Sequence, residues 1–145
     1  MPALAAGGGV PAVARFVITT AQRDGGFDIE LVSLSSSSRD VASMRLASPA
    51  SWLAGAGSRA VEWEGRSVNE IGVFGAELEF QRYRPRRALT QALSGCDLIQ
   101  VICGAPAWAN AVIGLDKPVA LQVATRARVE RRLRDARPTG LAGWW

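Results

Sequence analysis

The chain has 145 residues, 48 % of them hydrophobic and 21 % charged, which is typical of one globular domain and excludes disordered and fibrous classes. It contains no histidine, which excludes Ser-His-Asp and Cys-His catalysis, histidine proton shuttles and nearly all zinc sites. The net charge of +4 is uneven. Residues 1–81 carry six arginines against nine acidic residues, whereas residues 82–145 carry ten arginines and Lys117 against four, so the second half suits an anionic partner.

The first half of the chain predicts helices, a strand and a hairpin. Pro11 suits the first turn of a helix, and Gly25 follows where that helix should end. Glu64-Gly65 is a turn signal between two apolar runs and predicts the hairpin. The expected elements are a helix over residues 11–24, a strand over 27–34, a short helix over 48–53, and strands over 59–64 and 66–74.

The second half predicts alternating helices and strands. Pro85 marks a helix start after a basic turn, and Gly95 marks its end. Residues 97–103 are almost continuously apolar, which predicts a strand buried on both faces, hence parallel and central. The expected elements are a basic turn over residues 82–87, a helix from 85, strands over 97–103 and 119–124, and helices over 106–113 and 125–137.

This alternation predicts an α/β fold, with residues 1–145 forming a single domain built on a Rossmann-like, doubly wound parallel sheet with a β-hairpin insertion. Residues 98–115 carry no charge, but Gly104 and Pro106 interrupt them, so we expect a strand, turn and helix rather than a membrane span. Two cysteines cannot form a disulfide framework, and we expect Cys96 and Cys103 to be free in a reducing cytoplasm.

A run of three glycines, Gly7, Gly8 and Gly9, leads directly into the first predicted helix. Glycine lets the backbone approach a ligand closely, and a helix N-terminus offers unpaired N–H groups and partial positive charge. The run matches neither the dinucleotide-binding fingerprint nor a P-loop, since the spacing and the lysine are missing. It is either a ligand loop for an anion or a plain leader segment.

The chain resembles a known family over nearly its whole length. The sequence Gly8-Gly9-Val10-Pro11 is similar to the start of a glycosyltransferase 4-like N-terminal domain, the acceptor-side half of GT-B glycosyltransferases. The following segments, in order, fit the same pattern: Asp24-Gly25-Gly26-Phe27, Glu62-Trp63-Glu64-Gly65-Arg66, Phe80-Gln81-Arg82-Tyr83-Arg84-Pro85, Cys96-Asp97-Leu98-Ile99-Gln100-Val101, and Lys117-Pro118-Val119-Ala120-Leu121-Gln122.

The resemblance implies transfer of a sugar from a nucleotide-sugar donor to a glycan or lipid-linked acceptor, as in cell envelope glycan biosynthesis. It implies no metal and no further cofactor, and it assigns no catalytic residue. In the family the glycine loop lies at the substrate cleft, and ligands of open α/β sheets bind beyond the carboxyl ends of the strands. The expected substrate-binding residues are therefore Gly7, Gly8, Gly9, Ser35, Gly104, Ala105, Thr125 and Arg126. For Ser35 and Gly104, ordinary loop positions are the alternative.

Two departures from the family pattern predict an incomplete domain. Residues 1–6 stand where the family has its first, central strand, and they are too few and too rich in alanine for a buried strand. The donor-binding domain that follows in the family is not seen before Trp145. We therefore expect a GT-B N-terminal half that is short at both ends, with its first central strand short or missing, and inactive by itself.

The expected helix over residues 125–137 carries six arginines against two acidic residues. Such a helix suits peripheral contact with an anionic membrane through residues 126–137, and a solvated surface helix is the alternative. No targeting signal or nucleic-acid motif is recognised, so a cytoplasmic protein without a nucleic-acid partner is expected. The alternative to a transferase half is a non-catalytic Rossmann-like binding or interaction module.

Overall fold

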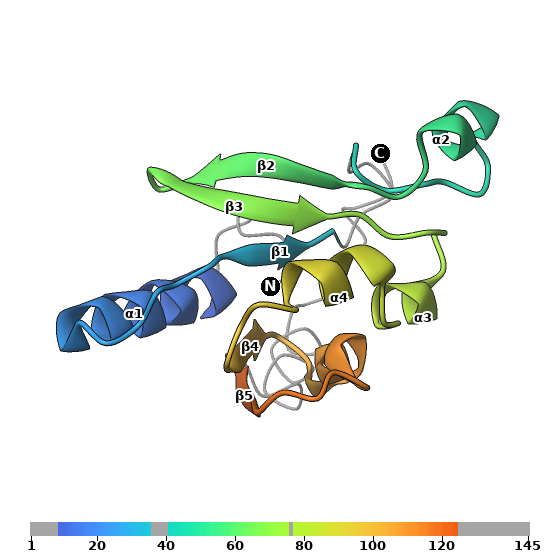
Figure 1. Ribbon diagram of the computed structural model, residues 1–145. Helices are drawn as coiled ribbons and strands as arrows, with labels where there is room; N and C mark the ends of the chain where they lie inside the picture. Colours follow the sequence, from blue (N-terminus) through green and yellow to red (C-terminus); the bar gives the residue numbers. More distant parts are fainter. Residues whose placement is uncertain (1–8, 36–40, 76, 125–145) are drawn as a thin grey trace, which may run out of the picture.

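The computed structural model describes residues 9–35, 41–75 and 77–124, which form a mixed α/β arrangement (Figure 1). In chain order the elements are α1 (Gly9–Asp24), β1 (Val32–Leu34), α2 (Pro49–Ala54), β2 (Ser58–Trp63), β3 (Arg66–Ile71), α3 (Glu79–Arg82), α4 (Arg87–Ala92), β4 (Ile99–Cys103), the 3₁₀-helix η1 (Pro106–Val112) and β5 (Val119–Val123). The α/β class and the order of the main elements agree with the sequence analysis.

The strands form two sheets in the described part of the chain, not the single sheet that the sequence predicts. The first sheet has the order β1-β3-β2 and the second contains β4 and β5. β1 pairs with β3 in parallel, β2 pairs with β3 in antiparallel, and β4 pairs with β5 in parallel. The predicted hairpin forms, and its second strand joins it to β1 in one sheet. The strand predicted over residues 97–103 forms as β4 and is parallel to its neighbour as expected; β5 is its one partner among the described residues, so its central place in a sheet stays a prediction.

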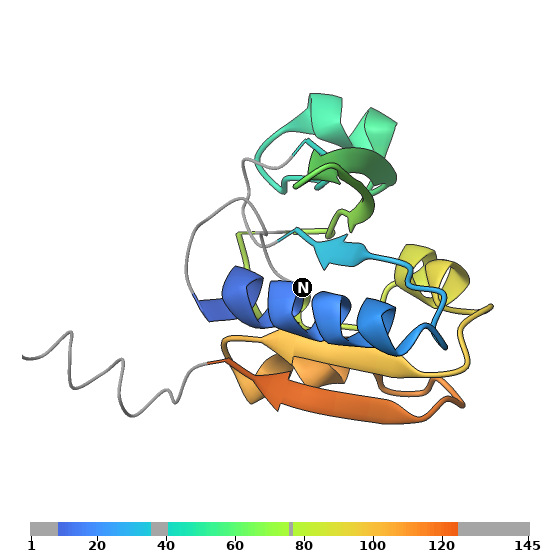
Figure 2. The same ribbon diagram turned by 90° about the vertical axis from the view of Figure 1, so that its left-hand side faces the viewer.

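Helix α1 packs against both sheets and holds them together. Its apolar face places Ala14 and Ile18 in one buried cluster with Leu31, with Val68 of β3 and with Ile102 of β4. In Figure 2 the arrows of β1, β4 and β5 point the same way, and α1 runs back across them in the opposite direction. This is the arrangement of a helix between parallel strands, and in coarse terms it is compatible with a Rossmann-like fold.

A second buried cluster lies on the face of the strands opposite α1. Helix α4 contributes Leu89, η1 contributes Trp108, and β1 and β4 contribute Leu34 and Cys103. Helices therefore cover both faces, as parallel strands require for burial. No described strand lies between β1 and β4, where the sequence analysis expects a short or missing strand, and residues 1–6 lie outside the described residues.

The hairpin turn forms at the predicted dipeptide. Glu64 and Gly65 have φ angles of 52° and 74°, the left-handed pair that a tight two-residue hairpin turn needs. The strand predicted over residues 27–34 is shorter than expected, because pairing with β3 starts only at Val32. The helix predicted over residues 106–113 is a 3₁₀-helix, and α3 forms just before the predicted basic turn.

Cys96 and Cys103 are both free, as predicted. Burial raises the pKa of the Cys103 thiol, which disfavours its thiolate form. No helix within the described ranges is long and apolar enough to cross a bilayer. The helix predicted over residues 125–137 lies outside the described residues.

Candidate functional site

The start of α1 lies against the carboxyl end of β4. A Cβ atom built on Gly104, the residue after β4, would stand 3.9 Å from Cγ2 of Val10, which is ordinary van der Waals contact. Figure 2 shows the start of α1 on the same side as the tips of the parallel strands. The structure thus brings Val10, the residue after the glycine run, beside Gly104.

Ser35 stands at the tip of β1, on the same side as the tip of β4 (Figure 2). Its backbone N–H donates to the carbonyl oxygen of Ile71 at 2.9 Å, which extends the β1–β3 pairing by one residue. The residue is only 1 % exposed, and its Oγ has no hydrogen-bond partner among the described residues. A buried hydroxyl without a partner is uncommon. The Ser35 Oγ can therefore still donate or accept a hydrogen bond at this edge.

Arg86 is a charged residue at the end of β3 whose role the sequence analysis does not predict. Its Nη1 donates to the carbonyls of Ile71 at 3.0 Å and Gly72 at 3.2 Å, and its Nη2 donates to the carbonyl of Arg82 at 2.7 Å. Burial lowers the pKa of the Arg86 guanidinium to about 10. No described carboxylate forms an ion pair with Arg86. The side chain joins the end of β3 to the start of α4, and its buried Nε keeps no partner among the described residues.

The remaining predicted site residues divide into two groups. Ala105 flanks the start of η1, and its carbonyl accepts a hydrogen bond from the Trp108 N–H at 3.2 Å. Gly7, Gly8, Thr125 and Arg126 lie outside the described residues. What the structure places at the carboxyl edge is therefore Gly9, Val10, Ser35, Gly104 and Ala105, and we call these five residues the carboxyl edge.

The chemistry available at the carboxyl edge is that of binding. It offers backbone groups at two glycines and one buried hydroxyl, and none of its five side chains titrates. A general acid, a general base or a nucleophile activated by a base is thus absent from these five residues. No group of three or more Cys, Asp or Glu side chains within the described ranges could hold a metal.

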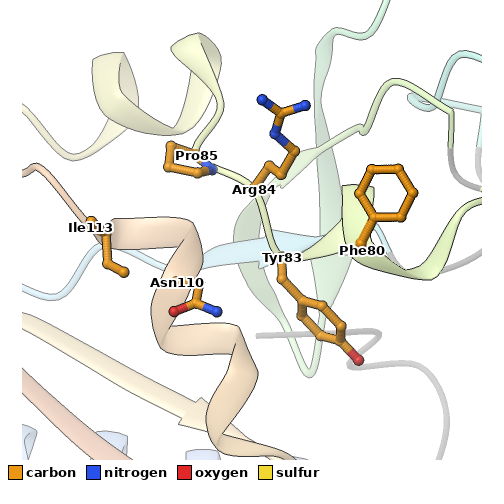
Figure 3. Close-up of a pocket in the computed structure, with 6 residues that line it drawn as sticks. All are labelled: Phe80, Tyr83, Arg84, Pro85, Asn110 and Ile113. Atoms are coloured by element: carbon orange, nitrogen blue, oxygen red, sulfur yellow. The ribbon is translucent and has the colours of Figure 1, made fainter.

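A separate small pocket of about 280 Å³ lies between the segments that follow β3 and β4. Its lining is Phe80, Tyr83, Arg84, Pro85, Asn110 and Ile113 (Figure 3). The Tyr83 ring meets Trp108 edge to face, with 5.0 Å between the ring centroids. In Figure 3 the guanidinium of Arg84 points away from the Asn110 amide. The polar groups do not converge, so this pocket has the character of packed aromatic surface rather than of a reaction centre.

Glu77 and Glu79 are two residues apart in the segment after β3, and each interacts with different groups. The N–H groups of Glu77 itself, of Leu46 and of Ala47 lower the pKa of the Glu77 carboxyl. Glu79 instead accepts a hydrogen bond from the Tyr83 hydroxyl at 3.2 Å. Each carboxylate serves a different structural partner, so two carboxylates sharing one reacting group are not found here.

Comparisons with known proteins were made for the sequence and for the structure, and none found a match. No family model matches the chain, and neither a curated protein nor a solved structure matches it.

Proposed function

We propose that the chain is the acceptor-side half of a GT-B glycosyltransferase, which binds a sugar substrate at the carboxyl edge and transfers no sugar by itself. The observation that carries the proposal is the contact position of Val10 and Gly104, where the start of α1 meets the end of β4. Substrates of open α/β sheets bind at such an edge, and a helix N-terminus there attracts phosphate.

The site residues support binding more than chemistry. Ser35 has a buried hydroxyl without a described partner, and Gly104 has no side chain that would stand between Val10 and a ligand. The carboxyl edge supplies no acid or base, so the reacting groups of a transferase would come from a second domain facing it. The sequence resemblance implies the same separation, with substrate binding in this domain and the reacting groups in a second one.

The test is a binding titration of the purified chain with uridine diphosphate glucose, together with an assay for sugar transfer. The proposal predicts weak, saturable binding and no transfer. The variant Gly104→Leu fills the space beside Val10 and is expected to weaken binding about tenfold or more. The matched control is Gly57→Leu, because Gly57 is exposed and a Cβ there meets nothing within 4 Å. Equal affinities of the two variants would refute the site, and transfer by the chain alone would refute the division of labour.

A non-catalytic binding or interaction module is the second candidate. It is favoured by the absence of any titratable side chain among the five residues of the carboxyl edge. Such a module gives no saturable binding of nucleotide-sugars, whereas a transferase half binds them and discriminates against free uridine. A titration with both compounds therefore separates the two candidates.

A further inference from the structure

Strand β2 is the edge strand of the first sheet. Among the described strands the order is β1-β3-β2, and Figure 1 shows β2 along the outer side of that sheet. All of β2 lies in residues 41–75, which the structure describes without a gap, and each of its residues is exposed or half-buried. Solvent therefore reaches this strand along its length.

The backbone groups of β2 point alternately toward β3 and away from it. At the start of the ladder the Gly72 N–H donates to the Gly57 carbonyl at 2.8 Å, so these two residues form a hydrogen-bonded pair. In an antiparallel ladder every second residue bonds to the neighbouring strand. The N–H and C=O groups of Ser58, Ala60 and Glu62 thus point away from β3, and no described residue bonds to them.

Little in β2 prevents another strand from pairing with this edge. Edge strands are usually protected by proline, by a bulge, by short length or by free charges. β2 has six residues, contains no proline and keeps an unbroken register with β3. Its one cation, Arg59, is bound to Glu70 of β3 at 2.7 Å. The edge is therefore long and regular enough to accept a further strand.

The charges of β2 suit a second copy of the same strand. Two identical edges pair in antiparallel around a two-fold axis, which sets each residue opposite one of the same face. An axis at Arg59 or at Glu62 would set like charges opposite each other, which is unfavourable. An axis at Ala60 sets Glu62 opposite Ser58 of the second copy, whose hydroxyl can donate to the carboxylate. It also pairs all three outward-facing residues, whereas an axis at Val61 would set Ser58 against the hairpin turn.

We propose that a second copy of this chain binds along β2, in antiparallel and with the two-fold axis at Ala60, so that the two first sheets join into one. Ala60 is small, so its two copies fit opposite each other at the axis. The shared edge is short, so the dimer is weak, with a Kd of about 10 μM to 1 mM. This interface is independent of the carboxyl edge and of the glycosyltransferase proposal.

Disulfide formation tests the register. Ala60→Cys, made in a Cys96→Ser background, should oxidise to a covalent dimer on a gel without reductant. Opposite residues of a hydrogen-bonded pair have Cα atoms about 5.5 Å apart, which a disulfide can span. Glu62→Cys in the same background is the matched control, since its two copies would lie about 13 Å apart along the strands. Equal cross-linking of the two variants, or none of Ala60→Cys, overturns the proposal.

Sedimentation velocity at increasing concentration measures the dimer of the native chain. Ala60→Lys sets two like charges opposite each other at the axis and should raise the Kd about tenfold or more. Ala12→Lys adds the same charge at an exposed position of α1 and should leave the Kd unchanged. Thermal unfolding of both variants in dilute solution checks that they fold. A native chain that stays monomeric up to about 1 mM overturns the proposal, and so does an equal Kd of the two variants.

Amide hydrogen exchange tests whether the edge is free in the monomer. At high dilution the amides of Ser58, Ala60 and Glu62 should exchange freely, and dimer formation should slow them about tenfold or more. The amides of Arg59 and Val61 face β3 and should be protected at every concentration, which makes them the internal control. Protection of the three outward amides in the monomer would overturn the proposal, because another part of the chain would then cover this edge.

Discussion

Ser35 and Arg86 donate hydrogen bonds to the same acceptor, the carbonyl oxygen of Ile71. The Ser35 backbone N–H reaches it at 2.9 Å and the Arg86 Nη1 at 3.0 Å. Ile71 itself is fully buried at the end of β3, where β3 pairs with β1. The end of the β1–β3 pair is therefore joined to the start of α4 by the half-buried guanidinium of Arg86.

Removing the Arg86 guanidinium should destabilise the fold. In Arg86→Met the carbonyls of Gly72 and Arg82 lose the donor described above. The hydrogen bonds that Arg86 donates stabilise the fold by more than the cost of burying its charge. We therefore expect the free energy of unfolding to fall by about 2–4 kcal/mol. Urea unfolding measures it. Arg87→Met, at an exposed neighbour, is the control and should change stability by less than about 0.5 kcal/mol. Equal stabilities of the two variants would contradict this role for Arg86.

Gly72 should not tolerate a side chain. A Cβ on Gly72 would stand 1.6 Å from the carbonyl oxygen of Ala42, and a backbone atom cannot move aside as a flexible side chain can. Gly72→Ala is therefore expected to cost about 3 kcal/mol or more, measured by thermal unfolding. Gly57→Ala is the matched control, since a Cβ at Gly57 meets nothing within 4 Å. A Gly72→Ala variant as stable as the control would show that residues 42 and 72 do not pack as described.

Trp108 should contribute more to stability than Trp52. Trp108 is 8 % exposed within the core cluster and meets the Tyr83 ring, so Trp108→Ala should cost about 3–5 kcal/mol. Trp52 is 55 % exposed, and its Nε1–H donates to the Arg45 carbonyl at 2.7 Å. The same substitution at Trp52 should cost only about 1 kcal/mol. The reverse order in denaturant unfolding would contradict the core assignment.

The ion pair between Arg15 and Glu64 should give the fold a pH dependence in the acid range. Arg15 Nε donates to Glu64 Oε2 at 2.9 Å, which ties α1 to the hairpin turn. The hydrogen bond from Arg15, helped by its charge, lowers the pKa of Glu64 below its ordinary 4.5. A carboxyl whose pKa falls on folding stabilises the fold above its unfolded pKa, and the effect is lost as the pH falls through the folded pKa.

The variant Arg15→Met should therefore be less stable than the native chain at pH 7 and equally stable once Glu64 is protonated. Thermal unfolding from pH 7 down through the acid range follows the difference. Arg23→Met removes an exposed arginine at the other end of α1, for which no ion pair with a described residue is found, and its effect should not vary in this range. A difference for Arg15→Met that stays constant to the lowest pH would exclude Glu64 as its partner.

The sequence predicts local structure better than pairing between distant strands. The bend at Glu64-Gly65 and the helix from Pro11 to Asp24 follow from turn chemistry and periodicity within a few residues, and the structure confirms both. The length of β1 is decided by its register with β3, which begins at Val32 and Asn69, far apart in the chain. Composition carries no signal for that register, so a strand from residue 27 is overpredicted.

The candidate site likewise combines features that the sequence predicts with features that it does not. The approach of Gly104 to Val10 could be anticipated, because strand ends and helix starts meet at one edge of an α/β fold. The role of Arg86 could not, since an arginine in the basic segment of residues 82–87 has the pattern of a solvated turn. Its burial depends on carbonyls at the end of β3 and on Arg82, which only the folded chain brings together.

The most direct test of the account is a residue-resolved NMR titration of the chain with uridine diphosphate glucose. The account predicts that the amide signals of Val10, Ser35 and Gly104 shift together with one saturation curve, while those of the hairpin turn at Glu64 and Gly65 stay in place. Shifts confined to the hairpin, or no shift at the carboxyl edge at saturating ligand, would contradict the assignment of this edge as the substrate site.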